Sequence, residues 1–126
     1  MNIKLDERLC EKYPQIFADR HADMRKTAMC WGFDCDDGWF DIIDELCEEI
    51  MQVCGDERVP VATQVKEKFG RLCFYIYGGN DAVHKAISKA EKKSSVTCEK
   101  CSKEGTLRGT SWVKTLCDKD TKSYEF

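Results

Sequence analysis

The sequence predicts an α+β fold, in which two amphipathic helices cover a small antiparallel hairpin or sheet and a zinc-ribbon-like lobe follows at the C-terminus. Three observations support this prediction. Two segments have helical periodicity, two runs between them alternate as strands, and cysteines with metal-ligand spacing follow the second helix. We expect residues 1–95 to form a helical and β-hairpin core domain and residues 96–126 to form the knuckle lobe and tail.

The N-terminal residues predict a short helix from about Leu5 that breaks near Pro14, because proline cannot continue a helix. The aromatic segment MRKTAMCWGFDCDDGWF then reads as an ordered loop. Its aspartates, which include Asp36 and Asp37, precede Gly38 in a register that does not fit a calcium loop. We therefore expect Asp36 or Asp37 to cap the next helix.

The segment GWFDIIDELCEEIMQVCG predicts the clearest helix of the chain. Apolar residues recur at helical spacing from Trp39 to Cys54, acidic residues take the opposite face, and Gly55 can end the helix. A second helix is predicted within NDAVHKAISKAEKKSS, which has an alanine-rich apolar stripe and a lysine-rich opposite face. These two helices can cover the predicted hairpin, which would not be stable by itself.

The hairpin is predicted from two runs joined at Gly70. In VATQVKEKF, alternation places Val61, Thr63, Val65 and Phe69 on one face, with Glu67 on the same side near the strand end or at a bulge. The run RLCFYIYG is rich in β-branched and aromatic residues. Basic and tyrosine side chains surround this turn, and such a surface can hold phosphate and stack a base. The predicted ligand- or anion-binding residues are Lys66, Lys68, Arg71, Tyr75 and Tyr77. Alternatively, the nearby Phe69, Phe74 and Ile76 form core and the lysines only protect a sheet edge.

The segment TCEKCSKEGTLRGTSWVKTLCDKD has the spacing of a zinc site. Cys98 and Cys101 form a C-x2-C knuckle, and Cys117 follows at a distance that suits a four-ligand site. Asp120 stands at the position of the fourth ligand, where a carboxylate oxygen is allowed but binds a soft metal more weakly. His84, His21 or water are alternative fourth ligands, and a lobe that has lost its metal is the competing interpretation. We expect bound Zn²⁺ to be structural, because no H-x-E base accompanies it.

The composition indicates how the cysteines are used, in which compartment we expect the protein, and how its charge is distributed. An odd count of nine cysteines favours metal ligands and buried thiols over a disulfide framework. We found no membrane-length apolar run and no signal-peptide h-region, so we expect a cytoplasmic protein without a membrane partner. Residues 1–60 carry a net charge of −8 and residues 61–126 carry +5. This asymmetry indicates either an anion-binding half or charge complementarity within the fold or between subunits.

The segments CWGFDCDDGWFDIIDELCEEI, VKEKFGRLCFYI and TCEKC…WVKTLCDKD together resemble a family of small, uncharacterised proteins of tailed phages and prophages. The resemblance spans Met29 to Asp120 and implies the three cysteine ligands. Family members end the knuckle with histidine or cysteine, and Asp120 departs from that pattern. The resemblance implies a phage-derived accessory protein acting in the host bacterial cytoplasm. The family has no known activity that the resemblance could assign to this chain.

Three functions remain open from the sequence. The first is a binding protein that binds a host protein or sequesters a small anionic, nucleotide-like host molecule, for example to counter host defence, either alone or as a homo-oligomer. Its predicted partner anchors are Trp31, Phe33 and Trp39. The second is a zinc-ribbon nucleic-acid-binding protein. Its predicted phosphate contacts are Lys85, Lys89, Lys92, Lys93, Lys100 and Lys103. The third, a metal-dependent hydrolase or nuclease, is the least favoured because no catalytic motif is present.

Overall fold

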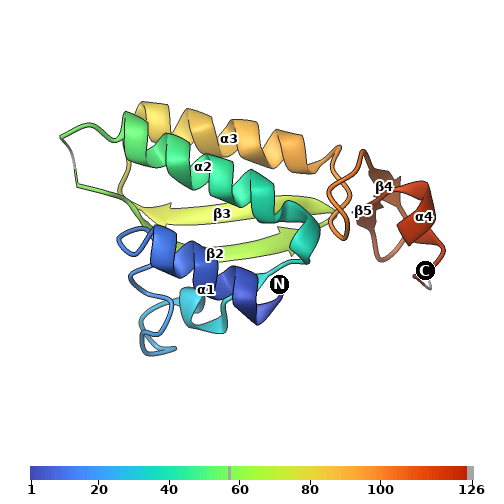
Figure 1. Cartoon of the computed structure of the whole chain (residues 1–126), viewed down its shortest axis with the longest axis horizontal. Helices are drawn as coiled ribbons and strands as arrows, with labels where there is room; N and C mark the ends of the chain where they lie inside the picture. Colours follow the sequence, from blue (N-terminus) through green and yellow to red (C-terminus); the bar gives the residue numbers. More distant parts are fainter. Residues whose placement is uncertain (57, 125–126) are drawn as a thin grey trace.

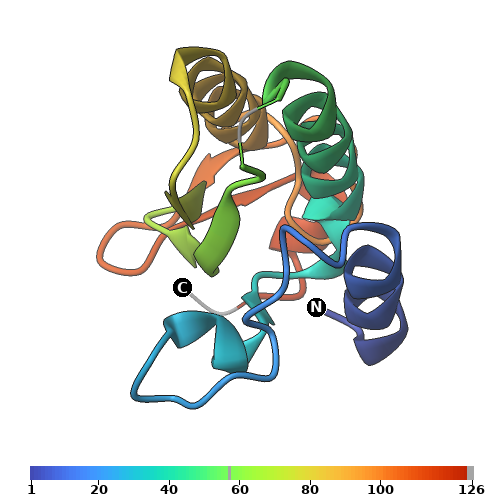
Figure 2. The ribbon, with the colours of Figure 1, turned by 90° about the vertical axis from the view of Figure 1, so that its left-hand side faces the viewer.

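The computed structural model, which describes residues 1–56 and 58–124, confirms the α+β fold. Helices α2 and α3 lie side by side over one face of a three-stranded sheet, and the C-terminal elements form a lobe beyond the end of the hairpin (Figure 1). Figure 2 shows both helices on the same side of the sheet. None of the helices in the described ranges has the length and apolar character needed to cross a bilayer.

The helices of the core domain begin and end close to the predicted positions. Helix α1 spans Ile3–Lys12, and Asn2 caps it by accepting a hydrogen bond from the Lys4 amide. Helix α2 spans Phe40–Val53, and Gly55 follows it with a φ of +61°, the conformation that commonly terminates a helix. Helix α3 spans Asp81–Ser94 and is capped by the Asn80 side chain.

The predicted capping of α2 by an aspartate is wrong. A short 3-10 turn, η2 (Asp37–Trp39), precedes the helix, and neither η2 nor α2 has a side-chain cap. The Asp36 carboxylate instead accepts a hydrogen bond from the Tyr124 hydroxyl, and Asp37 accepts one from the Asn2 amide. These acids therefore hold distant parts of the chain against the loop.

The larger sheet has the strand order β1-β2-β3. Strands β2 (Val61–Lys68) and β3 (Arg71–Tyr77) form the predicted antiparallel hairpin. The third strand, β1 (Phe33–Asp34), pairs with β2 in parallel and lies in the segment that we expected to be a loop. Only two residues form this strand, which is too short for a hydrophobic period to be detected in the sequence.

The alternation predicted for β2 is wrong at the start of the strand, because the pairing register shifts between Ala62 and Gln64 and not near Glu67. This β-bulge places Ala62 and Val65 in the core although they are three residues apart. Phe69 occupies the hairpin turn with a φ of +53° and is 77% exposed, so it does not belong to the core. From β3 the core receives Leu72 and Phe74.

Side chains of α3 cover the open edge of β3. The Leu72 amide donates to the Ser94 hydroxyl at 2.9 Å, and the Phe74 amide donates to the Glu91 carboxylate at 3.0 Å. Edge amides of a sheet otherwise offer a template for pairing with another chain. The helix therefore covers the inner face of the hairpin and also satisfies amides along its edge.

The C-terminal lobe contains a second, two-stranded sheet. Strand β4 spans Thr106–Arg108 and pairs antiparallel with β5, which spans Lys114–Leu116. A short helix, α4 (Asp118–Thr121), occupies part of the predicted polar tail, whose last two residues lie outside the described residues. The proposed domain boundary at residue 95 falls directly after α3 and stays a prediction.

Candidate metal centre

Cys98, Cys101, Cys117 and Asp120 lie close together and could bind a metal ion, since their ligand atoms all lie within 4.8 Å of one another. The Cys101 and Cys117 sulfurs are 3.6 Å apart, and Asp120 Oδ2 is 3.3 Å from Cys98 Sγ and 3.2 Å from Cys117 Sγ. A zinc tetrahedron with ordinary bond lengths has edges of about 3.6–3.8 Å. These three distances are within a few tenths of an ångström of such an edge, and the whole set lies within about one ångström of the spacing that a tetrahedral metal requires.

Local backbone geometry brings these ligands together. The C-x2-C segment turns back on itself, with the Ser102 amide donating to the Cys98 carbonyl and the Cys98 amide donating to the Lys103 carbonyl. Cys117 precedes α4, and its sulfur accepts the Asp120 amide at 3.4 Å. Two tight turns therefore present two ligands each, as the spacing predicted.

The electrostatics of the site favour a cation. Hydrogen bonding to Asp120 raises the pKa of Cys101 to about 12, and the same contacts with the three thiols lower the pKa of the Asp120 carboxyl. The Asp120 carboxylate thus opposes ionisation of the Cys101 thiol, and a bound cation reverses this preference. Three thiolates and one carboxylate would occupy all four positions of a tetrahedral metal, as in closed structural sites. Among the described residues, the ligand cluster does not include the alternative ligands His84 and His21.

Residues 96–124 carry the candidate metal ligands, and we call them the metal lobe. The C-x2-C knuckle of this lobe packs against the part of the chain that contains the loop before α2. Gly38 lies so close to this turn that an added Cβ would collide with the carbonyl groups of Cys98 and Glu99. The Gly38 amide donates to the Glu99 carbonyl at 2.6 Å, and the Gly38 carbonyl accepts the Ser102 hydroxyl at 2.6 Å. Only a glycine allows the backbone of the core to approach the knuckle this closely.

A buried charged pair completes this contact, and our sequence analysis did not identify it. Glu99 is 1% exposed and accepts hydrogen bonds from Lys114 Nζ at 3.2 Å and from the Asp36 amide at 3.0 Å. Burial raises the pKa of Glu99, because this carboxylate is the more deeply buried member of the pair. Burial of Lys114 acts to lower its pKa, but the negative charges of Glu99 and Asp36 outweigh this effect and raise the pKa of Lys114. The signal in the sequence that could have identified this pair was the acidic Glu99 between the candidate ligands Cys98 and Cys101.

The lobe also contacts the turn of the β2–β3 hairpin. The Thr115 hydroxyl donates to the Gly70 carbonyl at 2.5 Å, and a side chain at Gly70 would collide with Leu107. The candidate metal centre therefore supports a surface that is tied both to the loop before α2 and to the tip of the hairpin.

Two of the three predicted partner anchors are core residues. Trp39 is fully buried, and its indole nitrogen donates to the Thr97 carbonyl at 3.0 Å. Phe33 is 4% exposed and packs edge-on against Phe17, with ring centroids 4.9 Å apart. Neither ring can anchor a partner on the folded surface. Trp31 is 71% exposed, and its role as a partner anchor stays a prediction.

The five predicted ligand-binding residues all lie on one face of the hairpin, which we call the outer sheet face. Residues paired across two strands point to the same face, and Lys68 pairs with Arg71 in the turn-proximal register. Lys66, Tyr75 and Tyr77 likewise alternate with the buried residues of their strands, so they point away from α2 and α3. Tyr77 is 75% exposed and Tyr75 is 45% exposed.

Three of the lysines predicted to contact nucleic acid make contacts with other side chains of the protein. Lys89 forms an ion pair with Glu49 and Lys93 forms one with Glu45, both at 2.9 Å. Lys100 lies 5.2 Å above the Tyr124 ring. These ion pairs join the basic and acidic halves of the chain, which agrees with charge complementarity within the fold.

Comparisons with known proteins add no relative. No protein-family model matches the chain, and neither a curated protein nor a solved structure is similar to it.

Proposed function

We propose that this protein is a non-enzymatic binding module that holds a small anionic, nucleotide-like molecule on its outer sheet face. One observation carries the proposal: five residues chosen from sequence for their charge or aromatic ring share this face. Tyrosine rings give bases a stacking surface, and lysine and arginine supply charge for phosphate. Because the helices lie on the other side of the hairpin, they leave the exposed tyrosines accessible.

A titration with nucleoside mono-, di- and triphosphates tests this proposal, with isothermal calorimetry as the readout. We expect Tyr77→Ala to weaken binding about tenfold or more, since stacking on one ring contributes about 1–3 kcal/mol. Lys92→Ala is the control for non-specific charge, because Lys92 is an exposed lysine of α3. A loss in Lys92→Ala as large as that in Tyr77→Ala would argue for non-specific charge attraction.

We further propose that the bound metal is a structural Zn²⁺. The three-sulfur donor set favours a soft or borderline metal, and the four converging groups leave no position open for a substrate. Native mass spectrometry of protein purified without chelators should show one zinc per chain. Asp120→Cys should tighten zinc binding and Asp120→Ala should weaken it, while Asp118→Ala, an exposed acid of the same turn, should change little.

Single-stranded nucleic acid is the second candidate ligand, and the row of residues on the outer sheet face favours it. Tyr77 and Arg71 are six residues apart in β3, which corresponds to about 20 Å along a strand. A chain of several nucleotides can span this distance, whereas a mononucleotide cannot. Short oligonucleotides that bind more tightly than mononucleotides, with a steep salt dependence, would favour this second function.

The biological setting that we propose rests on the sequence resemblance alone. A phage-derived accessory protein in the bacterial cytoplasm would act on a host molecule, either by sequestering a nucleotide or by gripping a host factor. Purification of the protein from infected cells under native conditions, followed by mass spectrometry, tests this setting. A retained nucleotide-sized mass supports sequestration, and a protein without any retained molecule or partner opposes it.

A further inference from the structure

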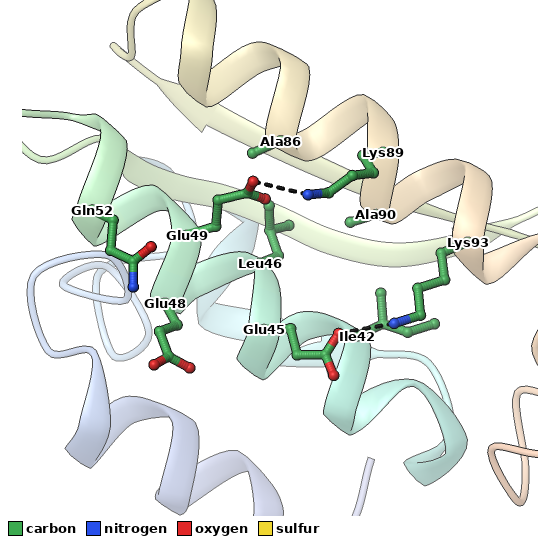
Figure 3. A pocket seen from close by; sticks show the side chains of 10 residues that line it. All are labelled: Ile42, Glu45, Leu46, Glu48, Glu49, Gln52, Ala86, Lys89, Ala90 and Lys93. Carbon is green, nitrogen blue, oxygen red and sulfur yellow. Dashed lines mark hydrogen bonds and ion pairs between the residues drawn. The ribbon is translucent and has the colours of Figure 1, made fainter.

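The pocket between α2 and α3 is not suited to an anion. It measures about 390 Å³, and its floor is formed by apolar residues such as Leu46 and Ala90 (Figure 3). Its two lysines, Lys89 and Lys93, are already paired with glutamates that cross the groove from α2. A third glutamate, Glu48, forms no ion pair with any residue that the structure describes, and it adds negative charge to the rim.

A second pocket lies on the outer sheet face, at the end of the hairpin that is far from the metal lobe. This sheet-end pocket measures about 510 Å³, which is within the range of about 300–1,000 Å³ that small-molecule sites occupy. Val61, Thr63 and Tyr77 form its sheet wall, and Ala18 contributes from the loop after α1. The pocket therefore includes one of the five residues that were predicted from sequence.

The β-bulge shapes the wall of this pocket. The register shift leaves Thr63 without a partner residue in β3, and Thr63 lines the pocket beside Val61. Bulges often occur beside functional sites, where they redirect a side chain. The Thr27 hydroxyl donates to the Thr63 carbonyl at 3.2 Å, and the Ala62 amide donates to the Ile16 carbonyl at 2.8 Å. Both bonds hold the N-terminal loop beside the bulge.

Two cations that the sequence did not single out line the sheet-end pocket. Lys26 lies 3.8 Å from the Asp19 carboxylate, so these two charges largely offset one another. Arg58 is exposed and takes part in no ion pair within the described ranges 1–56 and 58–124. The pocket thus has a net charge of +1, which suits a ligand with one anionic group. A guanidinium group can bind phosphate with two parallel hydrogen bonds.

We propose that the sheet-end pocket binds a nucleoside monophosphate, with the base against Tyr77 and the phosphate held by Arg58 and Lys26. This inference rests on the proposed function and specifies its ligand and location. A ligand of this size cannot also reach Arg71, which lies about 20 Å away along β3. Lys68 and Arg71 at the hairpin turn are therefore not part of this site.

The test is calorimetric titration of the full-length protein with AMP and UMP, and separately with adenosine and inorganic phosphate. We expect both nucleotides to bind, and adenosine or phosphate alone to bind at least tenfold more weakly. Arg58→Ala and Tyr77→Ala should each weaken AMP binding at least tenfold. Arg71→Ala compares the two ends of the sheet face, and it should weaken AMP binding only if the ligand lies at the hairpin turn. Arg8→Ala is the matched control, because it removes the same charge from an exposed arginine of α1 that does not line the pocket.

The outcomes separate this inference from the proposed function. Nucleotide binding that is weakened by Arg71→Ala and not by Arg58→Ala would place the ligand at the hairpin turn. The sheet-end assignment would then be wrong, although the proposed function would stand. Adenosine that binds as tightly as AMP would overturn the role of Arg58. If no nucleotide binds at all, both proposals fail. Equal melting temperatures for the wild type, Arg58→Ala and Arg71→Ala are required, so that unfolding does not imitate a loss of binding.

Discussion

The core domain and the metal lobe depend on different forces. Large apolar residues such as Leu9, Ile43 and Ile50 are fully buried in the core, and each contributes about 1.5–3 kcal/mol through burial. Within the described residues, the buried cluster of the lobe consists of Cys98, Leu116 and Cys117, with Tyr124 packed beside it. Two of its members are candidate metal ligands. The core should therefore fold without metal, whereas the lobe should require both the metal and its contact with the core.

Removal of a bound metal should produce the largest difference between the lobe and the core. Structural zinc contributes apparent binding free energies of about 10–16 kcal/mol in small zinc domains. We expect a strong chelator, or Cys98→Ser, to abolish hydrogen-exchange protection in residues 97–121 while α2 remains protected. Cys73→Ser is the matched control, since Cys73 lies in β3 outside the ligand cluster. Simultaneous loss of protection in both regions would show that the lobe and the core form one cooperative unit.

The docking contact between the regions should be the next most sensitive feature. Gly38→Ala introduces a methyl group against the backbone of the knuckle, and we expect a loss of about 3 kcal/mol in unfolding free energy. Gly55→Ala is the control. Its Cβ would have no neighbour within 4 Å, so only the left-handed backbone opposes it, at about 1 kcal/mol. Urea denaturation compares the two, and equal losses would contradict the importance of the close approach.

Alkaline pH should weaken a contact that belongs to the core alone. The Tyr13 hydroxyl donates to Asp44 at 2.7 Å, and burial together with this bond raises the pKa of Tyr13 to about 12. The folded state keeps this proton between pH 10 and 12 while the unfolded state releases it, so stability falls as the pH rises through this window. The slope from one such group is at most about 1.4 kcal/mol per pH unit.

Tyr13→Phe should therefore be less stable than the wild type at pH 8, by about 1 kcal/mol for the lost hydrogen bonds, and this difference should shrink above pH 10 and vanish at about pH 11. Tyr77→Phe, which changes an exposed ring, is the control. Urea midpoints measured from pH 8 to pH 11 provide the readout. A constant difference between wild type and Tyr13→Phe across this range would contradict the assignment.

The ion pairs between α2 and α3 should have the smallest effect. The side chains of Lys89 and Glu49 are 72% and 33% exposed, and pairs in such positions contribute about 0.2–1 kcal/mol. A double-mutant cycle with Lys89→Ala and Glu49→Ala should yield a coupling energy in this range that decreases at high salt. A coupling above about 2 kcal/mol would mean that the groove between the helices excludes water more than its exposure indicates.

Features encoded within one short stretch of chain could be predicted from the sequence. The apolar positions of α2 and α3 recur every three or four residues, which is visible without knowledge of the partner surface. The candidate metal ligands likewise lie in two tight turns, so the spacings of Cys98 to Cys101 and of Cys117 to Asp120 were sufficient to identify them. The common face of Tyr75 and Tyr77 follows from simple strand alternation.

Features that depend on contacts between distant segments were decided by the tertiary structure. The bulge in β2 adds one residue to a two-residue period, so alternation assigned Thr63 to the core although Ala62 lies there. Phe33 and Trp39 have the composition of surface anchors, and only the packing of the loop against Phe17 and Thr97 buries them. The pairing of Glu99 with Lys114 and the position of Arg58 beside Tyr77 also follow from chain folding. The sequence by itself determined the helices, the hairpin and the candidate metal ligands, because each is a local pattern. The tertiary structure decided which faces are covered, because burial depends on residues that are far apart in the chain.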